Sequence, residues 1–389
     1  MAPRRRGALT APGSLAAMAL PGAYLDEFSE PSGYLDFAAV GPLSRTARQA
    51  VVAAVARQSA AETPPTGALL AAQERAVARA AALLGTTADL VTMIPSTSAG
   101  LFQVAFGLPP GNVVVPAGEF PANRYPWLRA AARGGPAVRL VDEDRGRLTA
   151  DVIRPAVDAG TVAVVVSHVG FRSGFRADLG ALREAAGDAL LVVDAIQSLG
   201  ALRFPAGVAD VVVAGGQKWL RAGWGAGVLA VSPRALDRLL PGLSGWVGVE
   251  DFLDTDRPAP HDLLPGADRL RMGSPAFFAA PALEAALAVI EIAGSDAIEE
   301  AVLAGSRLVE EAVRRGGAEV LDPWRHDRER SGIVSFRLPG EPVAATCARL
   351  AAAGFVVAER GSWLRASPHA SSRRDAIAGL AGVLAAAGD

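Results

Sequence analysis

The chain has 389 residues, a formal net charge of −2 and a hydrophobic content of 51%, which suit a compact soluble protein with room for two domains. The sequence pI of about 6.2 shows no basic bias and argues against a nucleic acid or an anionic membrane surface as a partner. The single cysteine, Cys347, excludes an internal disulfide framework, and four scattered histidines without metal-ligand spacing predict no metal site.

Residues 1–33 are predicted to form a loosely packed leader. Three arginines near its start precede a mildly apolar run that superficially resembles an export signal, but Pro, Gly and Ser at residues 12–14 interrupt this run. The nearest approach to a membrane span, residues 275–293, carries Glu284 and Glu291 and is better explained as a buried helix. We therefore expect a cytoplasmic protein with no membrane partner.

Residues 44–240 alternate short β-branched runs with Ala-rich helical segments. Continuous apolar runs such as residues 162–166 predict strands that are covered on both faces, as in a mainly parallel α/β sheet. Ligands of such sheets bind beyond the carboxyl ends of the strands, so the residues just after each run are the candidates for a site. The predicted strands are Leu90–Ile94, Asn112–Val115, Ala137–Val141, Val162–Ser167, Ala189–Asp194, Asp210–Ala214 and Gly227–Val231.

A loop rich in Pro, Gly and Asp, residues 253–268, predicts a boundary between two domains. We expect a large domain over residues 34–260 and a smaller α+β domain over residues 261–389, which the N-terminal segment completes. The elements predicted for the small domain are helices over residues 275–293, 295–315, 342–353 and 372–387, with strands over residues 332–337 and 355–359.

Lys218 is the only lysine among the 38 Lys and Arg residues of the chain. Arginine stays charged and forms no stable imine, whereas a desolvated lysine amine can lose its proton and attack a carbonyl. A surface lysine retained by chance is the alternative, but the neighbouring sequence is mostly apolar. Lys218 therefore indicates Schiff-base chemistry.

Asp194 ends a predicted strand, and Lys218 follows 24 residues later, after the next strand. If both strand ends open onto one crevice, the Asp194 carboxylate, the Gln197 amide and the lysine amine meet there. A pyridoxal phosphate enzyme requires this set, because the carboxylate keeps the pyridine nitrogen protonated, the amide bonds the ring hydroxyl and the lysine holds the cofactor. A helix cap is the alternative for Asp194 taken alone.

Three further positions after strand ends are candidates for binding. Thr97 and Ser98 open an apolar helix, and hydroxyl and N–H groups at a helix N-terminus suit a phosphate, although an ordinary N-cap is the alternative. Phe120 is predicted to stack on a planar cofactor, with core packing as the alternative. Asn123 is one of only two asparagines and indicates an amide that contacts the substrate.

Five motifs in order resemble those of the class V aminotransferase family of fold type I pyridoxal phosphate enzymes, and the resemblance runs from about residue 34 to residue 385. The motifs are Ser167–Phe171, Asp194–Gln197, Gly215–Lys218, Arg271–Pro275 and Arg365–His369. The family includes cysteine desulfurases, selenocysteine lyases, kynureninases and isopenicillin N epimerases. The resemblance implies a mainly parallel seven-stranded sheet in a large domain with a smaller α+β domain beside it.

The resemblance also implies roles for particular residues. Lys218 would be the Schiff-base lysine, and the cofactor would be pyridoxal 5′-phosphate. Arg365 would bind the substrate α-carboxylate through its planar fork, with a surface ion pair as the alternative. Gly273 and Ser274 would reach the phosphate of a neighbouring subunit, which implies a homodimer with shared active sites. The other residues implied to contact the cofactor are Thr97, Ser98, Phe120, Asp194, Gln197 and Gln217.

The chain departs from the family at several positions. No cysteine precedes Arg365 on the loop where desulfurases carry their nucleophile, and Cys347 lies in an Ala-rich helical stretch, so we do not expect a Cys-dependent desulfurase. Phe171 stands where desulfurases place an asparagine, and Gly215 replaces a serine that often binds the phosphate. The residues considered for the side-chain pocket are Trp127, Trp246, Trp363 and Arg172, for each of which a structural role is the simpler interpretation.

The expected function is chemistry at the α-carbon of a small amino acid, as an aminotransferase or a β-lyase, including a carbon–sulfur lyase. A kynureninase-like hydrolase and an amino-acid epimerase stay open, because every branch of the family uses the same lysine. A nucleotide-dependent enzyme is disfavoured by the absence of a Gly-x-Gly-x-x-Gly motif and of a phosphate-loop lysine. A catalytically silent scaffold would more naturally have lost Lys218 or Asp194.

Overall fold

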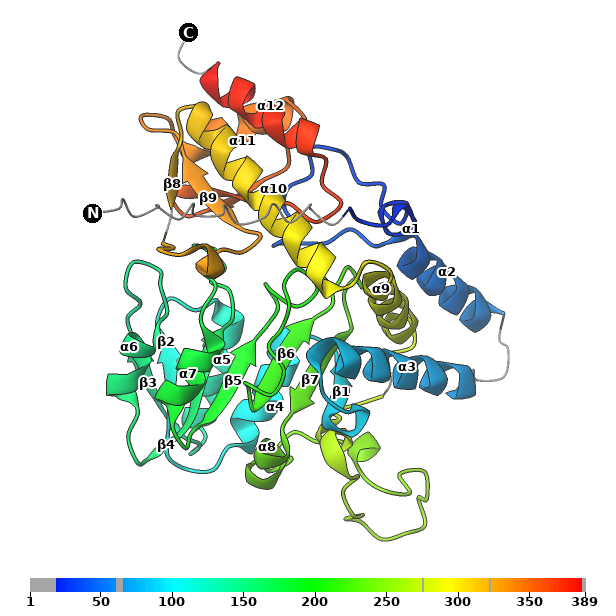
Figure 1. Cartoon of the computed structure of the whole chain (residues 1–389). Coiled ribbons are helices and arrows are strands. Elements are labelled where there is room, and N and C mark those ends of the chain that lie inside the picture. The colour runs from blue at the N-terminus through cyan, green and yellow to red at the C-terminus, as the bar shows by residue number, and fades with distance from the viewer. Residues whose placement is uncertain (1–18, 61–65, 275, 322, 387–389) are drawn as a thin grey trace, which may run out of the picture.

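The computed structural model describes residues 19–60, 66–274, 276–321 and 323–386, and its centre is a seven-stranded sheet (Figure 1). The strands lie in the order β1-β7-β6-β5-β4-β2-β3. Strands β3, β2, β4, β5 and β6 are parallel, whereas β7 runs antiparallel to both of its neighbours. The bounds are β1 Val91–Ile94, β2 Asn112–Pro116, β3 Ala137–Val141, β4 Thr161–Ser167, β5 Leu190–Asp194, β6 Val211–Gly215 and β7 Gly227–Val231. The mainly parallel seven-stranded sheet is therefore confirmed.

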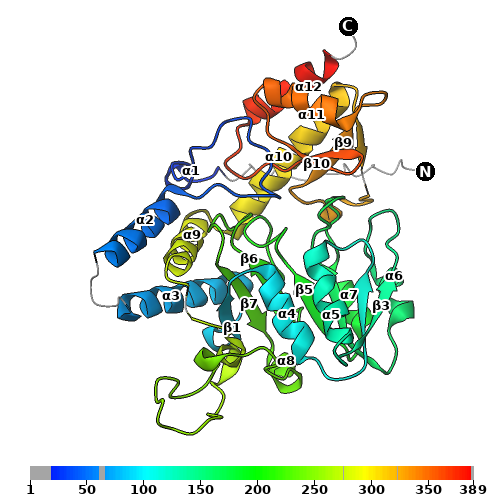
Figure 2. The same ribbon diagram turned by 180° about the vertical axis from the view of Figure 1, so that it is seen from behind.

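Alternate residues of the central strands face two separate cores, because successive side chains of a strand point to opposite faces. Val164 and Val166 of β4 pack with one core, and Val165 between them packs with the other. The first core is covered by α2 (Arg45–Ser59), α3 (Thr66–Leu84), α7 (Leu179–Ala186) and α9 (Ala279–Ala293). The second is covered by α4 (Thr97–Gly107), α5 (Tyr125–Ala131) and α8 (Pro233–Arg238), and the opposite placement of α7 and α4 can be followed in Figures 1 and 2.

A second, smaller sheet forms the other part of the molecule. Its four antiparallel strands lie in the order β10-β11-β9-β8, and α10 (Ser295–Arg315), α11 (Val343–Ala352) and α12 (Arg374–Ala385) pack with it. The strands are β8 Glu319–Leu321, β9 Val334–Arg337, β10 Ala358–Arg360 and β11 Trp363–Ala366. The N-terminal segment runs alongside this sheet through isolated bridges from Tyr34 to Val356 and from Asp36 to Ser367.

Several predicted elements of this part need correction. The strand expected over residues 355–359 begins only at Ala358, and the sequence pattern missed β8 and β11 altogether. Strand β8 has three residues, and β11 carries the buried Arg365, so neither shows the apolar run that marks the central strands. The predicted helix over residues 275–293 begins at Ala279 and joins the core of the large sheet, although it follows the loop where we placed the domain boundary.

Residues 1–18 of the predicted leader lie outside the described residues, and individual residues of the described remainder are anchored to the rest of the chain. Tyr24 in the short helix α1 (Gly22–Leu25) is 1% exposed. Glu30 accepts a hydrogen bond at 2.7 Å from Nη2 of Arg221, a residue that follows Lys218 by three positions. This stretch of the N-terminal segment therefore contributes to the surroundings of the lysine loop.

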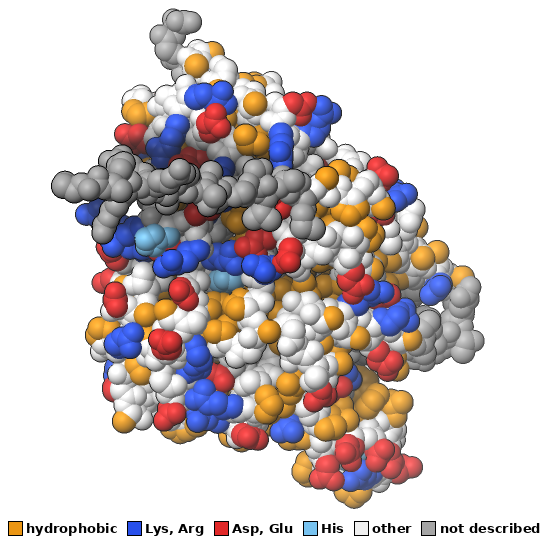
Figure 3. Space-filling view, viewed as in Figure 1, with side chains coloured by type: hydrophobic (Ala, Val, Ile, Leu, Met, Phe, Trp, Pro, Cys, Tyr) orange, Lys and Arg blue, Asp and Glu red, His pale blue; other side chains and the backbone are white. Residues whose placement is uncertain are grey.

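The two parts of the molecule meet across ion pairs. Arg147 bonds Glu329 at 2.9 Å and Arg176 bonds Glu299 at 2.6 Å, each linking the large sheet's loops to the smaller part. Figure 3 shows charged side chains gathered on this face between the upper and lower parts. Among the helices within the described ranges, none is long and apolar enough to cross a membrane.

Candidate active site

The carboxyl ends of β5 and β6 bring the predicted site residues together. Asp194 is the last residue of β5 and pairs in register with Val213 of β6. The chain leaves β6 at Gly215 and reaches Lys218 in the turn that follows. Parallel neighbours end at the same edge of a sheet, so the carboxylate and the amine reach one region from adjacent strands.

Lys218 lies in a setting that favours its neutral amine. Its Nζ is 5.7 Å from the centroid of the Phe120 ring. Burial lowers the pKa of Lys218 to about 8, and the charge of Asp194 partly opposes this shift. A fraction of the amine is therefore unprotonated and nucleophilic near neutral pH.

Asp194 is a buried carboxyl with one oxygen in use. Its Oδ1 accepts a hydrogen bond from the backbone N–H of Ile196 at 2.9 Å, and its Oδ2 has no hydrogen-bond partner within the described residues. The side chain is 3% exposed. Burial raises the pKa of Asp194 to about 6, while the Ile196 N–H and the Lys218 charge lower it. A cationic N–H donor would stabilise the ionised form of this group.

Gln197 is already held at both ends of its amide. Its Oε1 accepts from Trp219 Nε1 at 3.0 Å, and its Nε2 donates to the carbonyl of Ala38 at 3.0 Å. A primary amide has two N–H groups, so one of them stays available for a cofactor oxygen.

The start of α4 lies against the end of β6. Ser96 caps this helix by accepting from the N–H of Ala99, which leaves Thr97 and Ser98 in the first turn. Thr97 Oγ1 accepts from the N–H of Gly215 at 2.8 Å and keeps its own proton to donate. The helix N-terminus and this hydroxyl provide N–H and O–H donors suited to an anion.

Gly215 is the position at which the sequence resemblance predicts a serine, and the structure shows what a side chain there would meet. A Cβ at this position would collide with Gln217 Oε1 and would lie 3.1 Å from Thr97 Oγ1. The side chain of Gln217 therefore occupies the room that a serine side chain would need.

Arg365 enters the site from the smaller sheet. It is 1% exposed, donates through Nη1 to the carbonyl of Phe171 at 3.0 Å, and donates through Nη2 to Asp36 Oδ1 at 3.2 Å. Its Nε is buried without a hydrogen-bond partner. Burial lowers the pKa of Arg365 to about 10, and its charge lowers the pKa of Lys218 in turn. A buried guanidinium N–H without a partner is well suited to a carboxylate ligand.

The remaining predicted site residues differ widely in their exposure to solvent. Phe120 is 45% exposed, whereas Asn123 is fully buried, accepts weakly from Trp127 Nε1 at 3.4 Å and leaves its Nδ2 without a partner. Gly273 and Ser274 are exposed on the loop before α9. A Cβ on Gly273 would meet no atom within 4 Å, so this segment faces solvent in the single chain.

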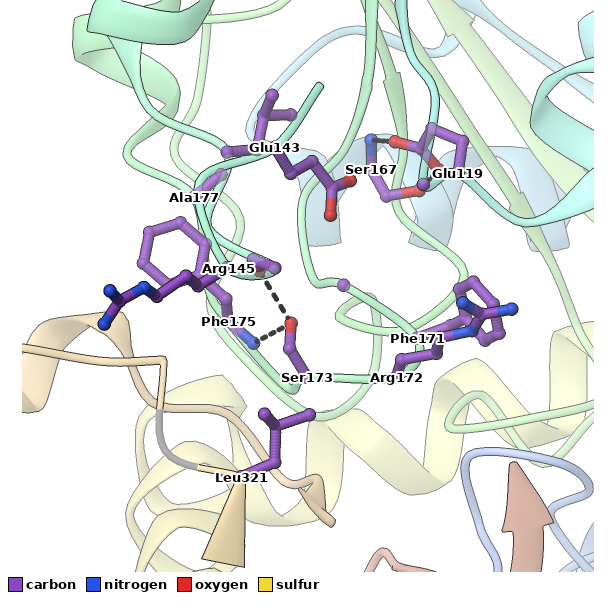
Figure 4. Close-up of a pocket in the computed structure, with 14 residues that line it drawn as sticks. Glu119, Glu143, Arg145, Ser167, Phe171, Arg172, Ser173, Phe175, Ala177 and Leu321 are labelled. Carbon is purple, nitrogen blue, oxygen red and sulfur yellow. Dashed lines mark hydrogen bonds between the residues drawn. The ribbon is translucent and has the colours of Figure 1, made fainter. Parts of the chain in front are cut away.

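Sequence reasoning missed a buried carboxyl beside Asp194. Glu119 accepts from the N–H of Ser167 at 2.6 Å and from its Oγ at 2.5 Å (Figure 4). Ser167 pairs in register with Asp194. Burial raises the pKa of Glu119 to about 7, the Ser167 hydroxyl lowers it and the Asp194 charge raises it further. Glu119 directly precedes Phe120 after a strand end, which is the signal that could have found it.

The donor set fits pyridoxal 5′-phosphate. A half-buried amine, a carboxyl with a free oxygen, an exposed aromatic face and a capped helix N-terminus surround the same strand ends. The family model for class V aminotransferases matches residues 47–363. The chain belongs to the class V aminotransferase family. It is therefore an enzyme of the pyridoxal phosphate-dependent transferase or lyase type, and its cofactor is pyridoxal 5′-phosphate.

Curated relatives of this class V chain are named for different activities. It is 28% identical over 297 residues to the uncharacterised aminotransferase YcbU of Bacillus subtilis, and the matched region covers 74% of this chain and 76% of YcbU. It is 32% identical over 288 residues to a kynureninase of Deinococcus radiodurans, and the matched region covers 69% of this chain and 67% of that enzyme. The family is thus shared across more than one reaction.

Solved structures confirm the fold type I architecture. A cysteine desulfurase from Thermococcus onnurineus superimposes with a TM-score of 0.80 at 23% identity over 91% of this chain and 94% of its own. The cystine C–S lyase C-DES, in complex with its product cysteine persulfide, superimposes with a TM-score of 0.81 at 19% identity over 91% of this chain and 97% of its own. At these identities the likeness concerns the fold alone.

Proposed function

We propose that this enzyme acts at the α-carbon of a small amino acid as an aminotransferase or a β-lyase, including a carbon–sulfur lyase. The observation that carries the proposal is the half-buried Lys218 amine, which faces Phe120 and lies near the Asp194 carboxyl, in a setting that lowers its pKa to about 8. When bound, pyridoxal phosphate accepts the electron pair that is released at the substrate α-carbon.

The residues of the site would bind the cofactor, transfer the proton and bind the substrate carboxylate. Lys218 would hold the cofactor covalently, and its free amine would serve as the base for the α-proton, since a pKa of about 8 suits proton transfer near neutral pH. Asp194 would accept from the ring N–H, and the remaining N–H of Gln197 would be available to the ring oxygen. Arg365 binds and orients the substrate carboxylate.

Phosphate binding falls to the start of α4, where Thr97 and Ser98 provide hydroxyl and N–H donors. Gln217 lies beside Thr97 and occupies the room of the usual serine side chain. Gly273 and Ser274 complete the phosphate site of a second copy of the chain. Phe277 and Phe278, which directly precede the next helix, are partly exposed in the single chain and would be available to such a second copy.

A kynureninase-like hydrolase is the second candidate, favoured by the 32% identity to the Deinococcus radiodurans kynureninase. A Cys-dependent desulfurase is disfavoured by the position of Cys347, which lies on α11 of the smaller part. Burial raises the pKa of the Cys347 thiol, so it is not activated as a nucleophile.

The test begins with the colour of the purified protein. We expect a visible absorption band that borohydride reduction converts into a covalent adduct, and we expect Lys218→Ala to lose this adduct. Colourless protein that ignores added pyridoxal phosphate would overturn the proposal. A product screen with amino acids and cysteine conjugates then separates the branches, since transamination leaves a keto acid and aminated cofactor, whereas β-elimination releases pyruvate and ammonia.

A further inference from the structure

A cavity of about 350 Å³ opens beyond the carboxyl ends of β2, β3 and β4 (Figure 4). Its volume falls within the range of small-molecule sites, about 300–1,000 Å³. The large sheet supplies most of its wall, and β8 of the smaller part closes it with Leu321. The residues used below are Glu119, Glu143, Ser167, Phe171 and Arg172, all of which line it.

Phe171 is a wall shared by this cavity and the active site. Its carbonyl accepts from Arg365 Nη1 at 3.0 Å, and its ring meets Phe120 edge to face with centroids 5.2 Å apart. Phe120 in turn faces the Lys218 amine at 5.7 Å. A substrate whose carboxylate binds Arg365 therefore has its side chain within reach of the cavity.

Glu143 directs an unused carboxylate into this space. Figure 4 shows the side chain pointing into the cavity, and no hydrogen bond or ion pair ties it to another residue in the described part of the chain. The carboxylate approaches the backbone closely, since a Cβ at Gly118 would lie 2.8 Å from Glu143 Oε2. Burial raises the pKa of Glu143 and the Arg172 charge lowers it, as expected for a desolvated acid without a direct partner.

Neither arginine that lines the cavity forms an ion pair with Glu143. Arg172 places its guanidinium 5.2 Å from the centroid of the Phe171 ring, and Arg145 is exposed and points away from the cavity in Figure 4. Glu119 adds a second carboxyl, which is bonded to Ser167. The cavity thus offers acceptor oxygens and apolar walls. The Arg172 charge reaches Glu143, but no cation forms an ion pair with this carboxylate among the residues that the structure describes.

We propose that this cavity receives the cationic end of the substrate side chain, an ammonium or guanidinium group, which donates hydrogen bonds to Glu143. The inference rests on the proposed function, because it takes the substrate to be an amino acid held at Arg365. A carboxylate is an acceptor only, and a charged donor forms the strongest hydrogen bond with it. The carbon chain that leads to the cation lies against Phe171.

The test compares L-arginine with L-citrulline, which has a similar length and a neutral end group. Each is titrated into the enzyme loaded with pyridoxal phosphate, and binding is followed by the change in the visible absorption band. We expect arginine to bind about tenfold more tightly or better, the ratio that corresponds to one hydrogen bond to a charged group. Glu143→Gln should bring this ratio close to one, and the matched control Asp142→Asn, an exposed acid next to it, should retain it.

Equal binding of the two amino acids by the unaltered enzyme would overturn the proposal, as would a preference for L-glutamate. A ratio that Glu143→Gln leaves unchanged would also overturn it. The band before any amino acid is added separates the two levels of inference. If the unaltered enzyme shows no visible band, the proposed function itself is wrong. A normal band in Glu143→Gln shows that the variant is folded and loaded with cofactor, so a changed ratio of arginine to citrulline affinity reports on the cavity.

Discussion

Arg365 on β11 donates to Asp36 at 3.2 Å and so joins the smaller sheet to the N-terminal segment beside Lys218. The ion pair fixes one edge of the guanidinium and leaves Nε without a partner. A binding group that is held in this way needs little reorganisation when a carboxylate arrives, which is the general advantage of preorganised sites.

Arg365→Lys should weaken amino-acid binding by about tenfold or more, because a lysine ammonium cannot reproduce the planar fork of donors. We expect KM to rise while the visible cofactor band without substrate stays unchanged. The measurement is a titration of the band with a substrate amino acid, alongside the same titration with the decarboxylated amine. If the acid and the amine lose affinity equally, Arg365 does not bind the carboxylate.

Glu119→Gln should change how stability depends on pH in the enzyme without cofactor. The folded-state pKa of Glu119 is about 7, above its usual value of 4.5, so the folded protein binds the extra proton between these two values. The contribution of Glu119 to the free energy of unfolding is therefore present at low pH. It is lost as pH rises towards 7, by an amount on the order of 3 kcal/mol.

Urea unfolding from pH 4 to pH 8 measures this difference. Relative to the original protein, Glu119→Gln should gain stability as the pH rises through this window and then level off above about pH 7. Glu184→Gln, which alters an exposed acid on α7, is the control and should follow the original protein. Parallel curves for Glu119→Gln and the original protein would contradict the raised pKa.

Gly215→Ser restores the serine that the family often has, yet we expect it to loosen this enzyme's hold on its cofactor. The new side chain meets Ile196 Cδ1, Thr97 Oγ1 and Gln217 Oε1, of which the last is the end of a flexible side chain that can shift, so we expect a cost at the low end of the about 1–3 kcal/mol that overpacking causes. The double change Gly215→Ser with Gln217→Ala makes room and should recover most of the loss. Thermal unfolding and the rate of cofactor release check both variants, and a single change as stable as the original would show that the room exists.

Cys347→Ser should leave turnover unchanged. The thiol lies on α11, and burial raises its pKa, so the reactive thiolate is disfavoured. The measurement is the product rate with each amino acid that the screen identifies, cysteine included. A loss of sulfur release that is confined to cysteine would reinstate the desulfurase mechanism.

The sequence by itself determined the central sheet and the place of its chemistry. Short apolar, β-branched runs predicted all seven strands. Most of these strands are buried on both faces, which leaves a local pattern in the chain, whereas the edge strand β3 is partly exposed. Lys218 and Asp194 could be assigned to one crevice because parallel strands end at one edge. The short strands of the smaller sheet left no such pattern, and β11 was missed although it carries Arg365.

Only the tertiary structure decided how the polar groups are used. Burial and partners come from residues far apart in sequence, so no local pattern reports that Glu119 is enclosed against Ser167, that Trp219 and Ala38 already hold Gln197, or that Asn123 is fully buried. The same holds for Glu143, with which neither arginine of the cavity forms an ion pair, because the Arg172 guanidinium lies over the Phe171 ring and Arg145 points away from the cavity. Residue type gave the chemistry that each group can perform, and long-range packing determined which of its bonds remain free.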